Sequence, residues 1–130
     1  MIRFFIAIAS ILAGLSVVGG AFASHALKEK ISDRALEIFE TGTRYQMYHA
    51  LALLLVSLLL LIQADSPAPK TLIASGISFI LGIIIFSGSL YALSLSGIKW
   101  LGAITPIGGV AFLIGWACLA IAALNLKINS

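Results

Sequence analysis

Four long apolar segments separated by short polar connections make up most of this sequence. They run from about residue 4 to 26, 45 to 63, 71 to 94 and 105 to 126, the last beginning near Ala103 or Pro106. A helix needs roughly 20 apolar residues to cross a hydrocarbon core about 30 Å thick, and each segment is close to that length. The pattern predicts an all-α membrane protein, a four-transmembrane-helix bundle in a single domain.

Two of the connections carry residues that end helices or favour the membrane surface. Pro67 and Pro69 stand between Asp65 and Lys70, which indicates a loop between the second and third segments. Residues 97–100, with the sequence Gly-Ile-Lys-Trp, are typical of a short turn at the headgroup level, where an aromatic ring and a long basic side chain are both favoured. We therefore expect little of the chain outside the bilayer.

The connection between the first two segments is longer and amphipathic. Ser32 is a suitable helix cap, and charged residues follow at helical spacing on one face with apolar residues on another. These are Asp33, Glu37, Glu40 and Arg44 against Leu36 and Phe39. We predict a short helix over about residues 32–42 that lies in the interface, an ion pair between Glu40 and Arg44, and a bend at residues 41–43. A solvated loop is the alternative.

The first segment has a second interpretation as a signal peptide. Arg3 precedes an apolar run, and residues 21–23 (Ala-Phe-Ala) before Ser24 resemble a cleavage site with small residues. The run is long for that role, and its glycines suggest helix packing instead. We therefore expect a first membrane span.

The composition supports membrane insertion and excludes several kinds of site. Hydrophobic residues make up 61% of the chain and charged residues 10%, too few to cover a soluble domain of this size. The eight Lys and Arg residues are dispersed, which fits contact with the lipid bilayer and gives no patch for nucleic acid. Cys118 is the single cysteine, so an intrachain disulfide is impossible. No catalytic or phosphate-binding motif occurs, and we predict no cofactor, metal site or catalytic residue.

Small residues recur on three of the four segments at spacings that bring helices close together. The rows are Ser16, Gly20 and Ser24 on the first, Gly88, Ala92 and Ser96 on the third, and Gly108, Gly115 and Ala122 on the fourth. We interpret them as packing surfaces within the chain. Association into a homo-oligomer or a larger membrane complex is the alternative use.

Polar and aromatic residues gather at one side of the predicted bundle. Short connections place the end of the first and third segments and the start of the second and fourth on that side. It holds His25, Tyr45, Gln46, Tyr48, His49, Ser87, Ser89, Tyr91, Trp100 and Thr105. We predict that His25, His49 and Tyr91 approach one another in a pocket there, with Gln46 and Ser89 as further ligand-binding candidates.

Each histidine can also be explained without a ligand, because ionisable and aromatic residues near span ends are favoured at the interface. As a pair, His25 and His49 would suit a metal, a haem iron or a proton relay, but only Glu40 or water is available as a further ligand. A structural hydrogen-bonded cluster joining three helices is the simpler interpretation of the predicted pocket.

Four sequence blocks at these positions resemble a known family. They are residues 20–27 (GAFASHAL), 45–50 (YQMYHA), 86–91 (FSGSLY) and 104–109 (ITPIGG). In this order they are similar to the domain-of-unknown-function 423 family of small bacterial inner-membrane proteins, relatives of the eukaryotic transmembrane protein 256. Ala23-Ser24 departs slightly from the Gly-Ala expected before the histidine. The resemblance implies four membrane helices in the bacterial plasma membrane and carries no catalytic residues.

Three classes of function remain after these observations. A structural or accessory membrane protein needs only packing surfaces and is our first interpretation. A transporter or channel would need a polar path, yet residues 50–62 offer only Ser57. A membrane enzyme or a protein that binds a small ligand or lipid would use the polar side. The basic residues are more numerous in the loops on that side, which predicts that this side is cytoplasmic and both termini are outside.

Overall fold

A computed structural model describes residues 1–63 and 69–126, and these residues form helices joined by short turns, with no strand among them. The elements are α1 (Ile2–Phe22), a π-helical turn η1 (Ala23–Leu27), α2 (Asp33–Ile62), α3 (Lys70–Gly82), a π-helical turn η2 (Ile83–Ser87), α4 (Gly88–Ser96), a 3-10 turn η3 (Lys99–Ala103) and α5 (Thr105–Leu124).

Four continuous helical stretches in this part of the chain are long and apolar enough to cross a membrane. They are Ile2–Leu27, Asp33–Ile62, Lys70–Ser96 and Lys99–Leu124. The prediction of an all-α bundle with four spans is confirmed. The predicted loop around Pro67 falls mostly on residues 64–68, outside the described residues, and Pro69 is the N-cap of α3.

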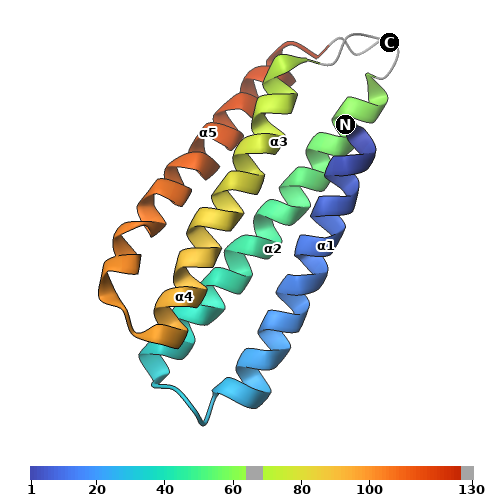
Figure 1. The fold of residues 1–130 in the computed structure, drawn as a ribbon. Coiled ribbons are helices and arrows are strands. Elements are labelled where there is room, and N and C mark those ends of the chain that lie inside the picture. The colour runs from blue at the N-terminus through green and yellow to red at the C-terminus, as the bar shows by residue number, and fades with distance from the viewer. Residues whose placement is uncertain (64–68, 127–130) are drawn as a thin grey trace.

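The helices run antiparallel, with α2 and α3 at the centre and α1 and α5 at the two edges (Figure 1). α1 packs chiefly on α2, whereas α5 packs chiefly on α3 and η2. The turn between α1 and α2 and the turn between α4 and α5 lie at the same end of the bundle (Figure 1). We call the half of the bundle formed by residues 12–49 and 86–105 the polar end.

The interior is apolar along most of its length. Phe5, Leu53, Leu72 and Phe79 are among the buried residues of the main cluster, and a smaller cluster surrounds Phe39 at the polar end. Large apolar side chains also cover the outside, as in Leu113, which is 69% exposed. An outer surface of this kind is suited to lipid rather than to water.

Aromatic side chains lie directly on glycines between the third and fourth spans. A Cβ added at Gly115 would come 2.6 Å from the Phe79 ring, and one added at Gly108 would overlap the backbone of Phe86. Gly108, Gly115 and Ala122, the row predicted on the fourth span, are all buried.

The packing row predicted on the first span is wrong beyond its first member. Ser16 is buried, but a Cβ at Gly20 would meet nothing within 4 Å, and Ser24 is exposed. The buried face instead passes through Gly19, whose added Cβ would touch Thr43, and through Ala23. Ser16, Gly19 and Ala23 follow the three- and four-residue spacing of one helix face, whereas a strict four-residue step drifts about 40° per step in a helix of 3.6 residues per turn.

The row predicted on the third span is wrong as an intrachain packing surface. Gly88, Ala92 and Ser96 are all exposed. The buried glycines of this span are Gly76 and Gly82, which precede η2. The buried residues of α4 are Ser89, Leu90 and Ser94, so the row of small residues lies on the other side of this helix.

The amphipathic segment is the N-terminal part of one unbroken helix, so the predicted bend at residues 41–43 is wrong. Ser32 caps α2 as predicted, accepting a hydrogen bond of 3.2 Å from the Ala35 backbone N–H. The hydroxyls of Thr41 and Thr43 donate at 2.8 Å to the carbonyls of Glu37 and Glu40, so they are satisfied without a break in the helix.

The packing predicted for this segment is nevertheless confirmed. Phe39 is buried against Leu27 and the partly buried Leu36, whereas Glu37 is exposed and Glu40 is only partly buried.

At the other turn of the polar end, Gly97 ends α4 with φ of 71°, a left-handed conformation that glycine adopts easily. Lys99 and Trp100, which follow in η3, are exposed.

Candidate functional site

The structure separates the predicted pocket residues rather than joining them in one hydrogen-bonded set. Gln46 and Tyr91 form one hydrogen-bonded pair, and His49 bonds to residues outside the predicted set. His25 is exposed in η1, and its ring forms no hydrogen bond with a described residue. Among the described residues, no hydrogen bond joins any two of His25, His49 and Tyr91, and their approach in one pocket stays a prediction.

Gln46 connects three helices at the polar end. Its side chain is 5% exposed, and its amide nitrogen donates to the Leu12 carbonyl of α1 at 2.8 Å. Its amide oxygen accepts from the hydroxyl of Tyr91 in α4 at 2.7 Å. The Tyr91 ring packs against Phe39, with 4.8 Å between the ring centroids, and it covers Gly42. A side-chain amide suits this position because it donates and accepts at once.

Serine hydroxyls add further bonds between helices beside Gln46. Ser16 of α1 donates to the Thr43 carbonyl at 2.6 Å, and Ser87 of η2 donates to the Gly42 carbonyl at 2.8 Å. Both carbonyls belong to α2, and a carbonyl oxygen can accept a second hydrogen bond besides the helical one. Buried hydroxyls in a medium without water need such partners.

Ser89, another predicted site residue, also has a structural partner. Its hydroxyl lies 2.6 Å from that of Thr105 and donates to the Phe86 carbonyl at 2.9 Å, so the contact with Thr105 joins α4 to the start of α5. Among the described residues, no fully buried side-chain oxygen or nitrogen lacks a partner. The polar end is thus a set of satisfied links between helices.

His49 is held by both of its ring nitrogens. Nδ1 lies 2.7 Å from the Tyr45 carbonyl oxygen, and the indole N–H of Trp116 donates to Nε2 at 3.1 Å. An indole nitrogen only donates and a carbonyl oxygen only accepts. The hydrogen must therefore be on Nδ1, and His49 is neutral in this arrangement. The ring also stacks on Phe112, with 3.4 Å between centroids and 7° between planes.

An apolar groove of about 410 Å³ lies beside His49, Phe112 and Trp116. Its walls include Tyr45, Tyr48 and His49 from α2, Phe86 from η2, and Phe112 and Trp116 from α5. Tyr48 is 55% exposed and Trp116 43%, so the groove is open to the surroundings of the bundle. We call it the aromatic groove.

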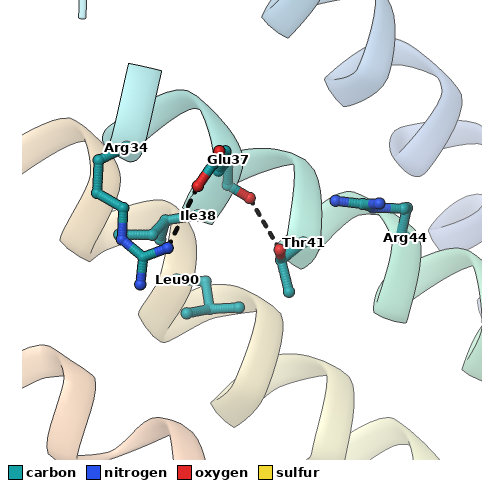
Figure 2. Close-up of a pocket in the computed structure, with 6 residues that line it drawn as sticks. All are labelled: Arg34, Glu37, Ile38, Thr41, Arg44 and Leu90. Carbon is teal, nitrogen blue, oxygen red and sulfur yellow. Dashed lines mark hydrogen bonds and ion pairs between the residues drawn. The ribbon is translucent and has the colours of Figure 1, made fainter. Parts of the chain in front are cut away.

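A second pocket of about 400 Å³ lies over the beginning of α2. Figure 2 shows Arg34, Thr41 and Arg44 along α2, with Leu90 of α4 below them. Arg34 forms an exposed ion pair of 3.2 Å with Glu37. The predicted pairing of Arg44 with the Glu40 carboxylate is wrong, because the Arg44 guanidinium donates instead to the Glu40 backbone carbonyl at 3.4 Å. We call this space the arginine pocket.

The described residues contain no cluster of three His, Cys, Asp or Glu side chains able to hold a metal ion. Sequence reasoning missed Trp116 as the partner of His49, and it missed the carbonyls of Gly42 and Thr43 as acceptors. An indole N–H within a membrane span needs a hydrogen-bond acceptor, and that signal was available for Trp116. A backbone carbonyl gives no such signal, because every residue carries one.

Comparisons with known proteins identify related membrane proteins. The family model described as "Protein of unknown function (DUF423)" matches residues 19–109. The "UPF0382 membrane protein YwdK" of Bacillus subtilis is 44% identical over 124 residues, covering 95% of this chain and 98% of the relative. A "UPF0382 membrane protein" of Staphylococcus epidermidis is 43% identical over 123 residues, covering 95% and 97%. No solved structure matches the chain.

Proposed function

This chain belongs to the DUF423 family of integral membrane proteins, and from that premise we propose that it is an accessory component of the bacterial plasma membrane. In this role the bundle is a rigid scaffold that acts through its surfaces. The proposal rests on what the buried polar groups of the polar end bind. Its buried amide and hydroxyl groups bond one helix to another, as Gln46 does between α1 and α4.

The same observation weighs against an enzyme that uses His49 as an acid or base. A general base needs a free nitrogen within reach of its substrate, and both nitrogens of His49 are occupied by Tyr45 and Trp116. A transporter is supported still less. The only polar side chain of α2 between residues 50 and 62 is Ser57, which is buried and donates to the Leu53 carbonyl at 2.7 Å.

The scaffold proposal is tested by complementation of a deletion strain. His49→Gln and Gln46→Leu should each restore function in proportion to the amount of folded protein in the membrane. Copolymer extraction without detergent, followed by cross-linking, should recover the wild-type protein in a larger assembly of defined composition. An unrelated four-helix membrane protein carrying the same tag is the control. A His49→Gln protein that is abundant and thermally stable but inactive would instead favour an enzyme.

The orientation follows from the charges at the polar end. We propose that the loop containing Lys28 and Lys30 and the turn containing Lys99 face the cytoplasm, since basic loops are retained there. A cysteine placed at Ser130, outside the described residues, should then react with an impermeant reagent in intact cells. Protection at that position together with labelling at Lys30→Cys would reverse the assignment.

A further inference from the structure

The arginine pocket and the aromatic groove lie on one face of α2. Arg34, Thr41 and Arg44 line the pocket, and Tyr45 and Tyr48 line the groove. With Glu37, which also lines the pocket, residues 34, 37, 41, 44 and 48 recur every three or four residues in an unbroken helix, so they form a single stripe along its side. Across the stripe, Leu90 closes the pocket and Phe86, four residues earlier, closes the groove. The two spaces therefore follow each other along the same seam.

The length of α2 places the two spaces at different depths. Its 30 residues make a helix about 45 Å long, which exceeds a hydrocarbon core of about 30 Å by roughly ten residues. All its charged residues lie between Asp33 and Arg44, and residues 45–62 carry none. The excess length therefore projects into the headgroup layer. The arginine pocket lies at headgroup level, and the aromatic groove lies just inside the hydrocarbon.

We propose that this seam binds one anionic phospholipid of the surrounding bilayer. Its phosphate lies in the arginine pocket, where the guanidinium groups of Arg34 and Arg44 can donate to it, and one acyl chain lies in the aromatic groove. Arginine is suited to this task because its planar guanidinium donates two parallel hydrogen bonds to a phosphate. The order of the two spaces, charged outside and apolar inside, matches that of a phospholipid.

The charges of the pocket favour an anionic over a zwitterionic headgroup. Two arginines and one carboxylate, that of Glu37, line the pocket, which leaves a net positive charge. Glu37 is engaged by Arg34, whereas Arg44 makes no ion pair with a described residue. In Figure 2 the Arg44 guanidinium stands apart from the Glu37 carboxylate, which is joined to Arg34. Arg44 is therefore the group free to take the phosphate.

The apolar half of the seam is suited to a single flexible chain. Ring faces form most of the groove, and Leu113 beside it is 69% exposed. A helix from a second copy of the chain is the competing occupant, but it would have to accommodate the exposed guanidinium groups at the headgroup end. A single phospholipid places a negative charge in the arginine pocket and an apolar chain in the aromatic groove.

Trp116 lines the groove and provides a direct probe of its occupant. In a Trp100→Phe background it is the only tryptophan, and brominated acyl chains quench tryptophan fluorescence on contact. The protein is reconstituted in vesicles of equal parts phosphatidylglycerol and phosphatidylcholine, with bromine on one lipid or on the other. Membrane composition and surface charge are then identical, and only the position of the quencher changes.

Brominated phosphatidylglycerol should occupy the groove about fivefold more than brominated phosphatidylcholine, since one net positive charge near the headgroups is worth about that factor. Arg34→Gln with Arg44→Gln should abolish the preference, and Glu37→Gln should increase it. Lys28→Gln with Lys30→Gln, which removes two exposed charges at the same end but off the seam, should leave it unchanged.

Three results would overturn the proposal. Equal quenching by the two brominated lipids would show that the seam does not select a headgroup. Loss of the preference in the Lys28 and Lys30 double variant would assign it to the general charge of this end. Weak quenching by both lipids, with cross-linking between copies through the groove, would assign the seam to a second chain. Because all five charged positions are exposed, each variant is expected to fold, and circular dichroism checks this.

Discussion

α1 is attached to α2 by polar side chains, whereas α3 is attached to α5 largely by rings packed on glycine. Gln46 and Ser16 donate to backbone carbonyls across the first pair. In the second pair the rings of Phe79 and Phe112 lie on Gly115 and Gly82, and Ser75 adds one hydrogen bond of 2.8 Å. Helices already in lipid gain little hydrophobic energy on contact, so each pair needs close packing or hydrogen bonds. The contact between α1 and α2 depends mainly on hydrogen bonds, and the contact between α3 and α5 depends mainly on close packing.

The largest effect should come from the packed side of the molecule. Gly108→Ala places a methyl group onto the backbone of Phe86, which cannot rotate away as a side chain would. We expect a loss of about 3 kcal/mol in the free energy of unfolding, the upper part of the range for overpacking. Unfolding in mixed micelles, followed by circular dichroism, measures it.

Gly109→Ala is the matched control, because the Cβ added there would meet Phe86 only at ordinary contact distances of 3.9–4.0 Å. It should change stability by no more than about 0.5 kcal/mol. Similar losses at the two neighbouring glycines would show that general helix effects, rather than the close approach to Phe86, determine the result.

The next largest effect should come from Gln46→Leu, which removes both of its bonds between helices. Such bonds are worth about 0.6 kcal/mol each on average in membrane proteins, with single values near 1.7. Because the Tyr91 hydroxyl also loses its partner, we expect a loss of about 1–2 kcal/mol. Tyr91→Phe removes one of the two bonds and should cost about half as much. A neutral result at Gln46 would contradict the polar attachment of α1.

A smaller loss, about 0.6 kcal/mol, is expected for Ser16→Ala, which removes one bond from α1 to α2. Ser10 and Ser24 are suitable controls, because their hydroxyls donate within α1 or η1 to the carbonyls of Ile6 and Gly20 and are exposed. Their replacement by alanine should be nearly neutral. Equal effects at the three serines would mean that the link between helices contributes nothing measurable.

The smallest effect concerns the link between α2 and α5. Trp116→Phe keeps a ring in the groove but removes the donor to His49, and we expect a loss of about 0.6 kcal/mol. Nitrogen chemical shifts of the His49 imidazole should identify the neutral form with the hydrogen on Nδ1 in the wild-type protein. Finding the hydrogen on Nε2 would exclude the bond from Trp116.

The four spans could be predicted from the sequence because charged residues are absent from long runs and concentrated between them. The polar end could be located for a similar reason, since Gln46, Tyr91 and Ser89 occur near the same span ends. The hydrogen-bond partner of each of these residues could not be predicted. A row of small residues does not show which side of its helix faces the interior, and Ser24 and Gly88, both predicted to pack inward, are exposed.

The unbroken α2 could not be recognised either, for a different reason. Gly42 between two threonines is normally a sign of a bend. In the structure the absent side chain of Gly42 provides space for the Tyr91 ring, so a tertiary contact explains the glycine. Sequence alone does not distinguish a glycine required for conformation from one required for space.

The connectivity of the hydrogen bonds also bears on how the protein is made. The groups that form the bonds between α1 and α2 all lie within the first 46 residues, at Leu12, Ser16, Thr43 and Gln46, so these bonds can form before the later spans are made. The bonds to Ser87, Tyr91 and Trp116 must wait for the later spans. Since synthesis proceeds from the N-terminus, the first helical hairpin can assemble during translation and then serve as the template on which the second one docks.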